Sequence, residues 1–146
     1  MKIYLDNCCY NRPYDDQSQL RISLETQAKL YVQEMIKNGE LELTTSYVLQ
    51  YENSENPYEI RKRAISEFVR SYSNEHIDYD RAEEVGKMAK DIMKTGVKTK
   101  DAHHVACAIL ASCDYFLTTD KRLLKYATDE IKIMNPIDFI EELEER

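Results

Sequence analysis

The sequence is poor in residues that break regular structure, and it has no tryptophan. Only three glycines and three prolines occur among its 146 residues, so we expect few long loops. No apolar run approaches the roughly 18 residues that a membrane helix needs. The N-terminal residues lack the charged segment and apolar stretch of a secretory signal. These absences predict one domain over residues 1–146, in the cytoplasm and not in a membrane.

Cysteines are few and poorly spaced for metal binding. Cys8 and Cys9 are adjacent, and Cys107 and Cys113 lie far along the chain, so no CxxC pair is present. A structural zinc site needs four well-spaced nitrogen or sulfur ligands, and this pattern does not supply them. Reduced thiols fit a cytoplasmic protein.

Basic residues are outnumbered, with 20 Lys and Arg against 27 Asp and Glu and a net charge of -7. This balance argues against broad, charge-driven binding to nucleic acid, which needs basic surface. The objection weakens if several acids form one metal site, because divalent cations would offset their charge.

Short apolar runs alternate with amphipathic segments along the chain. We predict strands at 2–5, 41–45, 115–119 and 131–134, and a polar loop from the first strand to about residue 17. Predicted helices follow at 18–38, after Ser46, from Pro57, after 78–80, from Thr99 and from Pro136, with a short one at 123–126. Strands that alternate with helices favour an α/β fold, with a parallel sheet of about four strands and helices on both faces.

Four acids fall where such a sheet binds ligands, beyond the carboxyl ends of its strands. Asp6 and Asp120 follow apolar strands, Asp101 lies in the first turn of a helix, and Glu52 lies on the helix after the second strand. Carboxylate oxygens suit Mg²⁺ or Mn²⁺ better than Zn²⁺. Such a site can activate a water for attack on a phosphodiester.

Each acid also has an ordinary structural interpretation. Asp6 and Asp120 fit turns at strand ends, Asp101 fits the helix N-terminus, and Glu52 fits a solvated helix surface. The metal-site prediction therefore rests on all four arriving at compatible places in one topology.

Several segments together resemble a known family. "IYLDNCCY", "SYVLQYENSENP", "KTKDAHHVACAILASCDYFLTTDKRLL" and "IKIMNPIDF" are similar to PIN-domain proteins of the type found in VapC-like toxins. The resemblance covers nearly the whole chain and implies a Mg²⁺- or Mn²⁺-dependent ribonuclease. It assigns the catalytic, metal-binding acids to Asp6, Glu52, Asp101 and Asp120. It also implies that the hydroxyl of Thr118 or Thr119 holds these ligands in place.

Neighbouring residues leave alternatives open. Glu55 lies three residues after Glu52 on nearly the same helical face and is an alternative ligand. At most one of His103 and His104 faces the site, because adjacent helical residues point about 100° apart. His104 is the better placed, although packing or surface exposure is the favoured interpretation.

Basic residues flank the predicted ligands. Lys100 and Lys121 are adjacent to two of the acids, and Arg12 lies in the loop after Asp6. We predict, more weakly, that these three contact RNA phosphates.

The sequence therefore predicts a metal-dependent endonuclease of single-stranded RNA. The resemblance adds the toxin of a toxin-antitoxin pair, a small antitoxin partner and a homodimer. Two alternatives remain: a non-catalytic PIN-like scaffold that binds partners, and a phosphatase with an aspartate nucleophile. Cys8 disfavours the phosphatase, since a haloacid-dehalogenase-type site would have a second Asp there.

Overall fold

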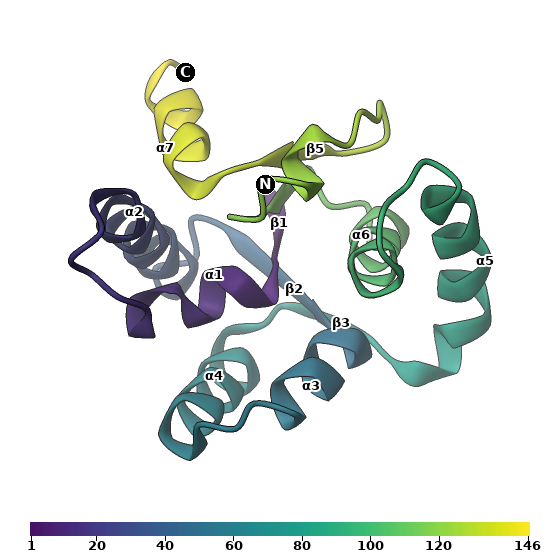
Figure 1. The fold of residues 1–146 in the computed structure, drawn as a ribbon, viewed down its shortest axis with the longest axis horizontal. Helices are drawn as coiled ribbons and strands as arrows, with labels where there is room; N and C mark the ends of the chain where they lie inside the picture. The colour runs from purple at the N-terminus through teal and green to yellow at the C-terminus, as the bar shows by residue number, and fades with distance from the viewer.

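The computed structural model describes residues 1–146 and contains a parallel sheet between two layers of helices (Figure 1). The strands are β1 (Lys2–Leu5), β2 (Glu42–Ser46), β3 (Glu75–Ile77), β4 (Tyr115–Leu117) and β5 (Lys132–Met134). The α-helices are α1 (Asn7–Asn11), α2 (Leu20–Lys37), α3 (Tyr47–Ser54), α4 (Glu59–Tyr72), α5 (Ala82–Met93), α6 (Thr99–Leu110) and α7 (Pro136–Glu144). Short 3₁₀ helices occur at Arg12–Tyr14, Tyr79–Arg81 and Leu123–Lys125.

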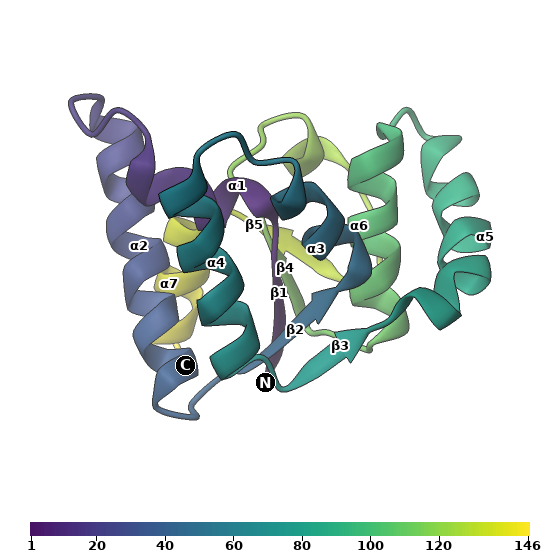
Figure 2. The same ribbon diagram turned by 90° about the horizontal axis from the view of Figure 1, so that it is seen from below.

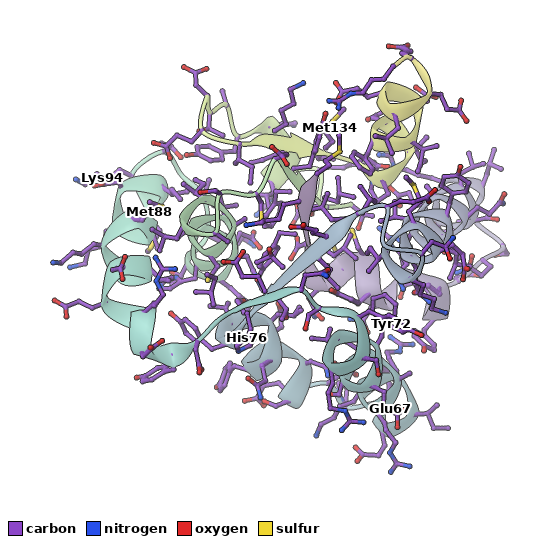
Figure 3. The ribbon with its side chains drawn as sticks, turned by 180° about the vertical axis from the view of Figure 1, so that it is seen from behind. Glu67, Tyr72, His76, Met88, Lys94 and Met134 are labelled. Atoms are coloured by element: carbon purple, nitrogen blue, oxygen red, sulfur yellow. The ribbon has the colours of Figure 1, made fainter.

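All strand pairs are parallel, and their order is β3-β2-β1-β4-β5. The predicted α/β class and the four predicted strands are confirmed. The fifth strand, β3, is an addition: only three residues pair with β2, and they include His76, so no apolar run marks them. Figure 3 shows the molecule from behind, with His76 of β3 labelled between Met88 of α5 and Tyr72 of α4.

Side chains of the central strands alternate between two cores. Ile3 and Leu5 of β1 pack on the side covered by α1, α2, α4 and α7, whereas Tyr4 packs on the side of α5 and α6 (Figure 2). The ring of Tyr4 stacks on that of Phe116 from β4, with centroids 5.3 Å apart. Helices therefore cover both faces of the sheet, as predicted. The carboxyl edge of the sheet is where ligands bind in folds of this class.

Local sequence signals set several helix boundaries correctly. The hydroxyl of Ser46 accepts a hydrogen bond from the backbone N of Leu49 at 3.1 Å, and Asn135 caps α7 through Ile137 N at 2.9 Å.

The segment after Asp6 was predicted as a loop, but it begins with α1. The Asp6 side chain caps this helix by accepting from Asn7 N, so the strand-end acid is also the start of a helix.

None of the helices is both long and apolar enough to cross a membrane.

Lys29 of α2 is a buried cation, 6% exposed, between α1 and α4. Its Nζ hydrogen-bonds the neutral amide of Gln33 at 2.6 Å and lies 5.7 and 5.8 Å from the ring centroids of Tyr10 and Phe68. Burial lowers the pKa of Lys29 from 10.5 to about 8. Folding therefore has to desolvate an ammonium that lacks a carboxylate partner.

We expect Lys29→Met to stabilise the protein. Below pH 8 the ammonium is charged in both states, and its removal should raise the free energy of unfolding by about 1–3 kcal/mol. Between pH 8 and 10.5 the folded state loses this proton first, so wild-type stability should rise with pH through Lys29. Urea unfolding of Lys29→Met at pH 7 and 9.5, beside the exposed control Lys90→Met, measures both effects. A less stable Lys29→Met protein at pH 7 would contradict the account.

Candidate metal centre

The carboxyl edge of the sheet has a switch point beside β1. The chain moves from β1 outward to β2 and β3, then returns to place β4 on the other side of β1. In parallel α/β sheets ligands bind at such a point. Asp6 directly follows β1, and Asp120 follows β4 after two threonines. The topology therefore gathers the two predicted strand-end acids at this edge.

Asp6 is buried and is held by several donors. Its Oδ1 accepts from Asn7 N at 2.8 Å, and its Oδ2 accepts from the Thr118 hydroxyl at 2.8 Å. The Cys8 thiol lies 3.4 Å from the same Oδ2. These bonds fix the orientation of a carboxylate that is otherwise short of water.

Thr118 joins the two strand-end acids. Its Oγ1 donates to Asp6 and accepts from the backbone N of Asp120 at 3.0 Å. Thr119 is also buried, but its hydroxyl has no hydrogen-bond partner. Of the two threonines that the sequence left open, Thr118 is therefore the one that contacts the candidate ligands.

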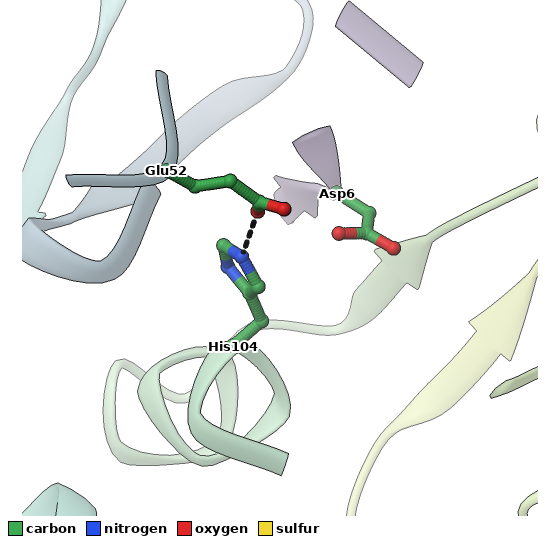
Figure 4. Close-up of side chains that lie close together, drawn as sticks. All are labelled: Asp6, Glu52 and His104. Carbon is green, nitrogen blue, oxygen red and sulfur yellow. Dashed lines mark hydrogen bonds and ion pairs between the residues drawn. The ribbon is translucent and has the colours of Figure 1, made fainter. Parts of the chain in front are cut away.

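The Glu52 side chain extends from α3 toward Asp6 and His104, as Figure 4 shows. Its Oε1 lies 2.7 Å from Nε2 of His104, and its Oε2 lies 3.6 Å from Nζ of Lys100. Burial favours a higher pKa for Glu52, but the hydrogen bond to His104 and the nearby Lys100 outweigh it and lower that pKa. Glu55 lies at the exposed end of α3, and Glu52 is the glutamate near Asp6.

Asp101 lies in the first turn of α6, and its pKa depends on burial and on the neighbouring acids. Burial, together with the charges of Asp6 and Asp120, raises its pKa from 3.8 to about 6. Like charges this close disfavour ionisation of the whole group. Asp120 is further fixed by accepting from the backbone N of Arg122 at 2.8 Å.

The arrangement fits a divalent cation. Asp6, Glu52 and His104 each offer a ligand atom, and these atoms lie within 4.8 Å of one another. Carboxylate oxygens suit both Mg²⁺ and Mn²⁺. A cation there would also offset the charges of Asp6 and Asp120, which together with burial raise the pKa of Asp101.

His104 contacts a candidate ligand, which the sequence did not predict. It is completely buried, and it contacts Glu52 directly instead of serving only in helix packing. The neighbouring His103 is turned to the backbone O of Thr99, 2.7 Å away. The spacing of three residues after Asp101 was the available signal, but the sequence did not reveal that Glu52 would meet this face.

Arg12 is placed differently from the expectation. Its Nε lies 3.1 Å from the buried carboxylate of Glu25, and its Nη1 donates to Asp15 at 2.9 Å. These acids already engage the guanidinium, and the predicted contact between Arg12 and RNA phosphate stays a prediction. Lys121 is exposed beside Asp120 and Lys100 faces Glu52, so their substrate-binding roles stay predictions.

Comparison with known proteins identifies the class of protein. The PIN domain model matches residues 3–129, and the chain belongs to the PIN domain family. This confirms the resemblance seen in the sequence. No curated protein shows significant sequence similarity to the chain.

Solved structures share the fold at low identity. VapBC2 from Rickettsia felis, solved bound to a DNA fragment from its promoter, aligns with a TM-score of 0.59 and 14% identity over 92% of this chain and 98% of that one. FitAcB from Neisseria gonorrhoeae aligns with a TM-score of 0.58 and 16% identity over 92% and 97% of the two chains. FitAB bound to the IR36 DNA fragment aligns with a TM-score of 0.57, 15% identity and coverage of 92% and 95%.

We predict opposite outcomes for the two adjacent threonines. Thr118→Val leaves Asp6 without its hydroxyl donor and should lower the free energy of unfolding by about 1–3 kcal/mol. Thr119→Val removes an unpaired buried hydroxyl and should be neutral or stabilising by up to about 1 kcal/mol. Denaturant unfolding of the two isosteric variants makes the comparison, and equal losses of stability would contradict the assignment of Thr118.

Proposed function

We propose that this protein is a Mg²⁺- or Mn²⁺-dependent endoribonuclease that cleaves single-stranded RNA in the cytoplasm. The observation that carries the proposal is the close approach of Asp6 and Glu52 at the switch point of a PIN fold, where the charges of Asp6 and Asp120 also act on Asp101. The close approach of Asp6, Glu52 and His104 and the raised pKa of Asp101 both support it. All four acids are proposed as catalytic metal ligands.

The chain's own residues supply position and charge. Thr118 and the N-terminus of α1 orient Asp6, and His104 orients Glu52. A bound divalent cation would neutralise charge on the phosphodiester and activate a water for its hydrolysis. Lys100 and Lys121 border this edge and are proposed to contact the RNA phosphates on either side.

An aromatic groove that includes Lys100, the lysine 3.6 Å from Glu52, supports a single-stranded substrate. The groove has a volume of about 650 Å³, and its lining includes Tyr47, Tyr51, Tyr79 and Lys100. Tyr51 and Tyr79 are 64% and 72% exposed, and the rings of Tyr47 and Tyr79 meet edge to face at 5.4 Å. Exposed aromatic rings stack on unpaired bases, which duplex RNA keeps inside its helix.

We further propose that the protein is the toxin of a toxin-antitoxin pair. Its fold similarity to VapBC2 and FitAcB supports this, as does the VapC-like pattern of acids. The proposal implies a small antitoxin that covers the carboxylate edge, and a homodimer of the chain.

The direct test is cleavage of a mixed set of labelled single-stranded RNAs. Wild-type protein should cleave with Mg²⁺ or Mn²⁺ and not with EDTA. Asp6→Asn and Asp120→Asn should each lose more than about 100-fold in rate, because each removes charge from the metal site.

The control for this test is Asp114→Asn. Asp114 is exposed at the opposite end of β4, where it accepts from the backbone N of Lys2, and its variant should cleave like wild type. Absence of both cleavage and divalent-cation binding in the wild type would reject the enzyme and favour a scaffold. Hydrolysis of phosphomonoesters without RNA cleavage would favour the phosphatase.

The aromatic groove generates a separate prediction about substrate. Loss of one stacking ring in Tyr51→Ala should lower kcat/KM for single-stranded RNA by about 10-fold, given the ~1–3 kcal/mol typical of base stacking. Tyr31→Ala on α2 removes a ring of similar exposure, 57% against 64% for Tyr51, away from the groove and should leave kcat/KM unchanged. Equal kinetics for wild type and Tyr51→Ala would show that the groove does not hold bases.

A further inference from the structure

A continuous chain of hydrogen bonds begins and ends on α3 and passes through three other elements. Leu49 N of α3 lies 3.1 Å from Ser46 Oγ at the end of β2, and Ser46 Oγ lies 2.6 Å from Tyr4 Oη on β1. Tyr4 Oη lies 2.6 Å from Nδ1 of His104 on α6, and Nε2 of His104 lies 2.7 Å from Glu52 Oε1, back on α3.

For a neutral His104 ring, the chemistry of the groups at both ends fixes the direction of this chain. The backbone N–H of Leu49 only donates, and the carboxylate of Glu52 only accepts. Nε2 of His104 therefore carries a proton toward Glu52. In the neutral imidazole the other nitrogen, Nδ1, must then accept, so the Tyr4 hydroxyl donates to it and the Ser46 hydroxyl donates to Tyr4. Every donor and acceptor in the chain is satisfied.

Burial makes the loss of any one hydrogen bond in this chain costly. Tyr4, Ser46 and His104 are each 0% exposed. Water therefore does not replace a lost partner, and an unpaired group in this chain would pay the full cost of desolvation. Tyr4 also lies two residues before Asp6 on β1, so the same chain ties down the strand that presents the first acid.

We propose that His104 is a positioning residue, held as its Nε2–H tautomer by Tyr4 and Ser46, that fixes Glu52 Oε1 and leaves Glu52 Oε2 for the cation. Lys100, 3.6 Å from Oε2, is the group that the cation would displace. The role deepens the proposed function and rests on it for the cation, whereas the tautomer stands on hydrogen bonds alone. Interactions of this kind orient ligands and are worth about 10–100-fold in metal affinity or activity.

The tautomer has its own measurement, which does not depend on metal. A long-range ¹H–¹⁵N spectrum of the ¹⁵N-histidine-labelled, metal-free protein at pH 7.5 should show His104 as a single Nε2–H tautomer. An Nδ1–H tautomer or an imidazolium would overturn the proposal.

Metal affinity tests the positioning role. Mn²⁺ binding followed by EPR should weaken about 10–100-fold in His104→Leu and return to within about threefold of wild type in His104→Gln, whose amide N–H donates at the Nε2 position. His76→Leu alters an exposed histidine of β3 and should bind Mn²⁺ like wild type. Equal affinities for wild type and His104→Leu would overturn the proposal.

A second variant and a spectroscopic measurement test the positioning role independently of His104→Leu. Tyr4→Phe removes one hydroxyl without changing shape, so it answers the question if His104→Leu fails to fold, and its Mn²⁺ affinity should fall severalfold. Spin-echo modulation from a directly bonded ¹⁴N on bound Mn²⁺ would show His104 to be a ligand and would overturn the positioning role. If wild type binds no Mn²⁺ while the Nε2–H tautomer is observed, the proposed metal site fails and the tautomer assignment survives.

Discussion

The rest of the site depends on one electrostatic constraint: four carboxylates share one edge of a sheet in a chain that is already acidic. Burial is the largest cause of the raised pKa of Asp101, and repulsion by Asp6 and Asp120 adds to it. Fixed donors reduce it for individual groups, through Thr118 and the start of α1 at Asp6 and through His104 at Glu52. These donors orient Asp6 and Glu52 but leave the negative charge of the four carboxylates in place. A divalent cation would offset that charge.

Away from the carboxyl edge of the sheet, a group of polar contacts around the buried Glu25 joins the helices on one face of the sheet. Glu25 of α2 meets Arg12 and Arg21 and accepts from Asn135, which also caps α7. This hub links α2, the segment after α1 and the start of α7, so the helix that Asp6 caps is anchored at its far end.

Much of the fold followed from the sequence because apolar runs and caps are local signals. The four strands that the apolar runs predicted and the caps at Ser46 and Asn135 are of this kind. The edge strand β3 is too short and too polar to be seen, and α1 was hidden because the Asp6 cap looks like a turn. Asp6 and Asp120 could be proposed from their places after strands, and Glu52 and Asp101 from their places on the helices that follow β2 and precede β4. The buried contact of His104 with Glu52, and of Arg12 with Glu25, joins residues far apart in sequence and needed the three-dimensional arrangement.

The central claim is that the carboxylate edge holds a divalent cation, and a crystal grown with Mn²⁺ tests it most directly. An anomalous difference map should show a peak among Asp6, Glu52, Asp101 and Asp120, with His104 bonded to Glu52 and not to the ion. The same crystals of Asp6→Asn should lack that peak. Well-ordered side chains at this edge with no anomalous density, in crystals that bind Mn²⁺ elsewhere, would contradict the account.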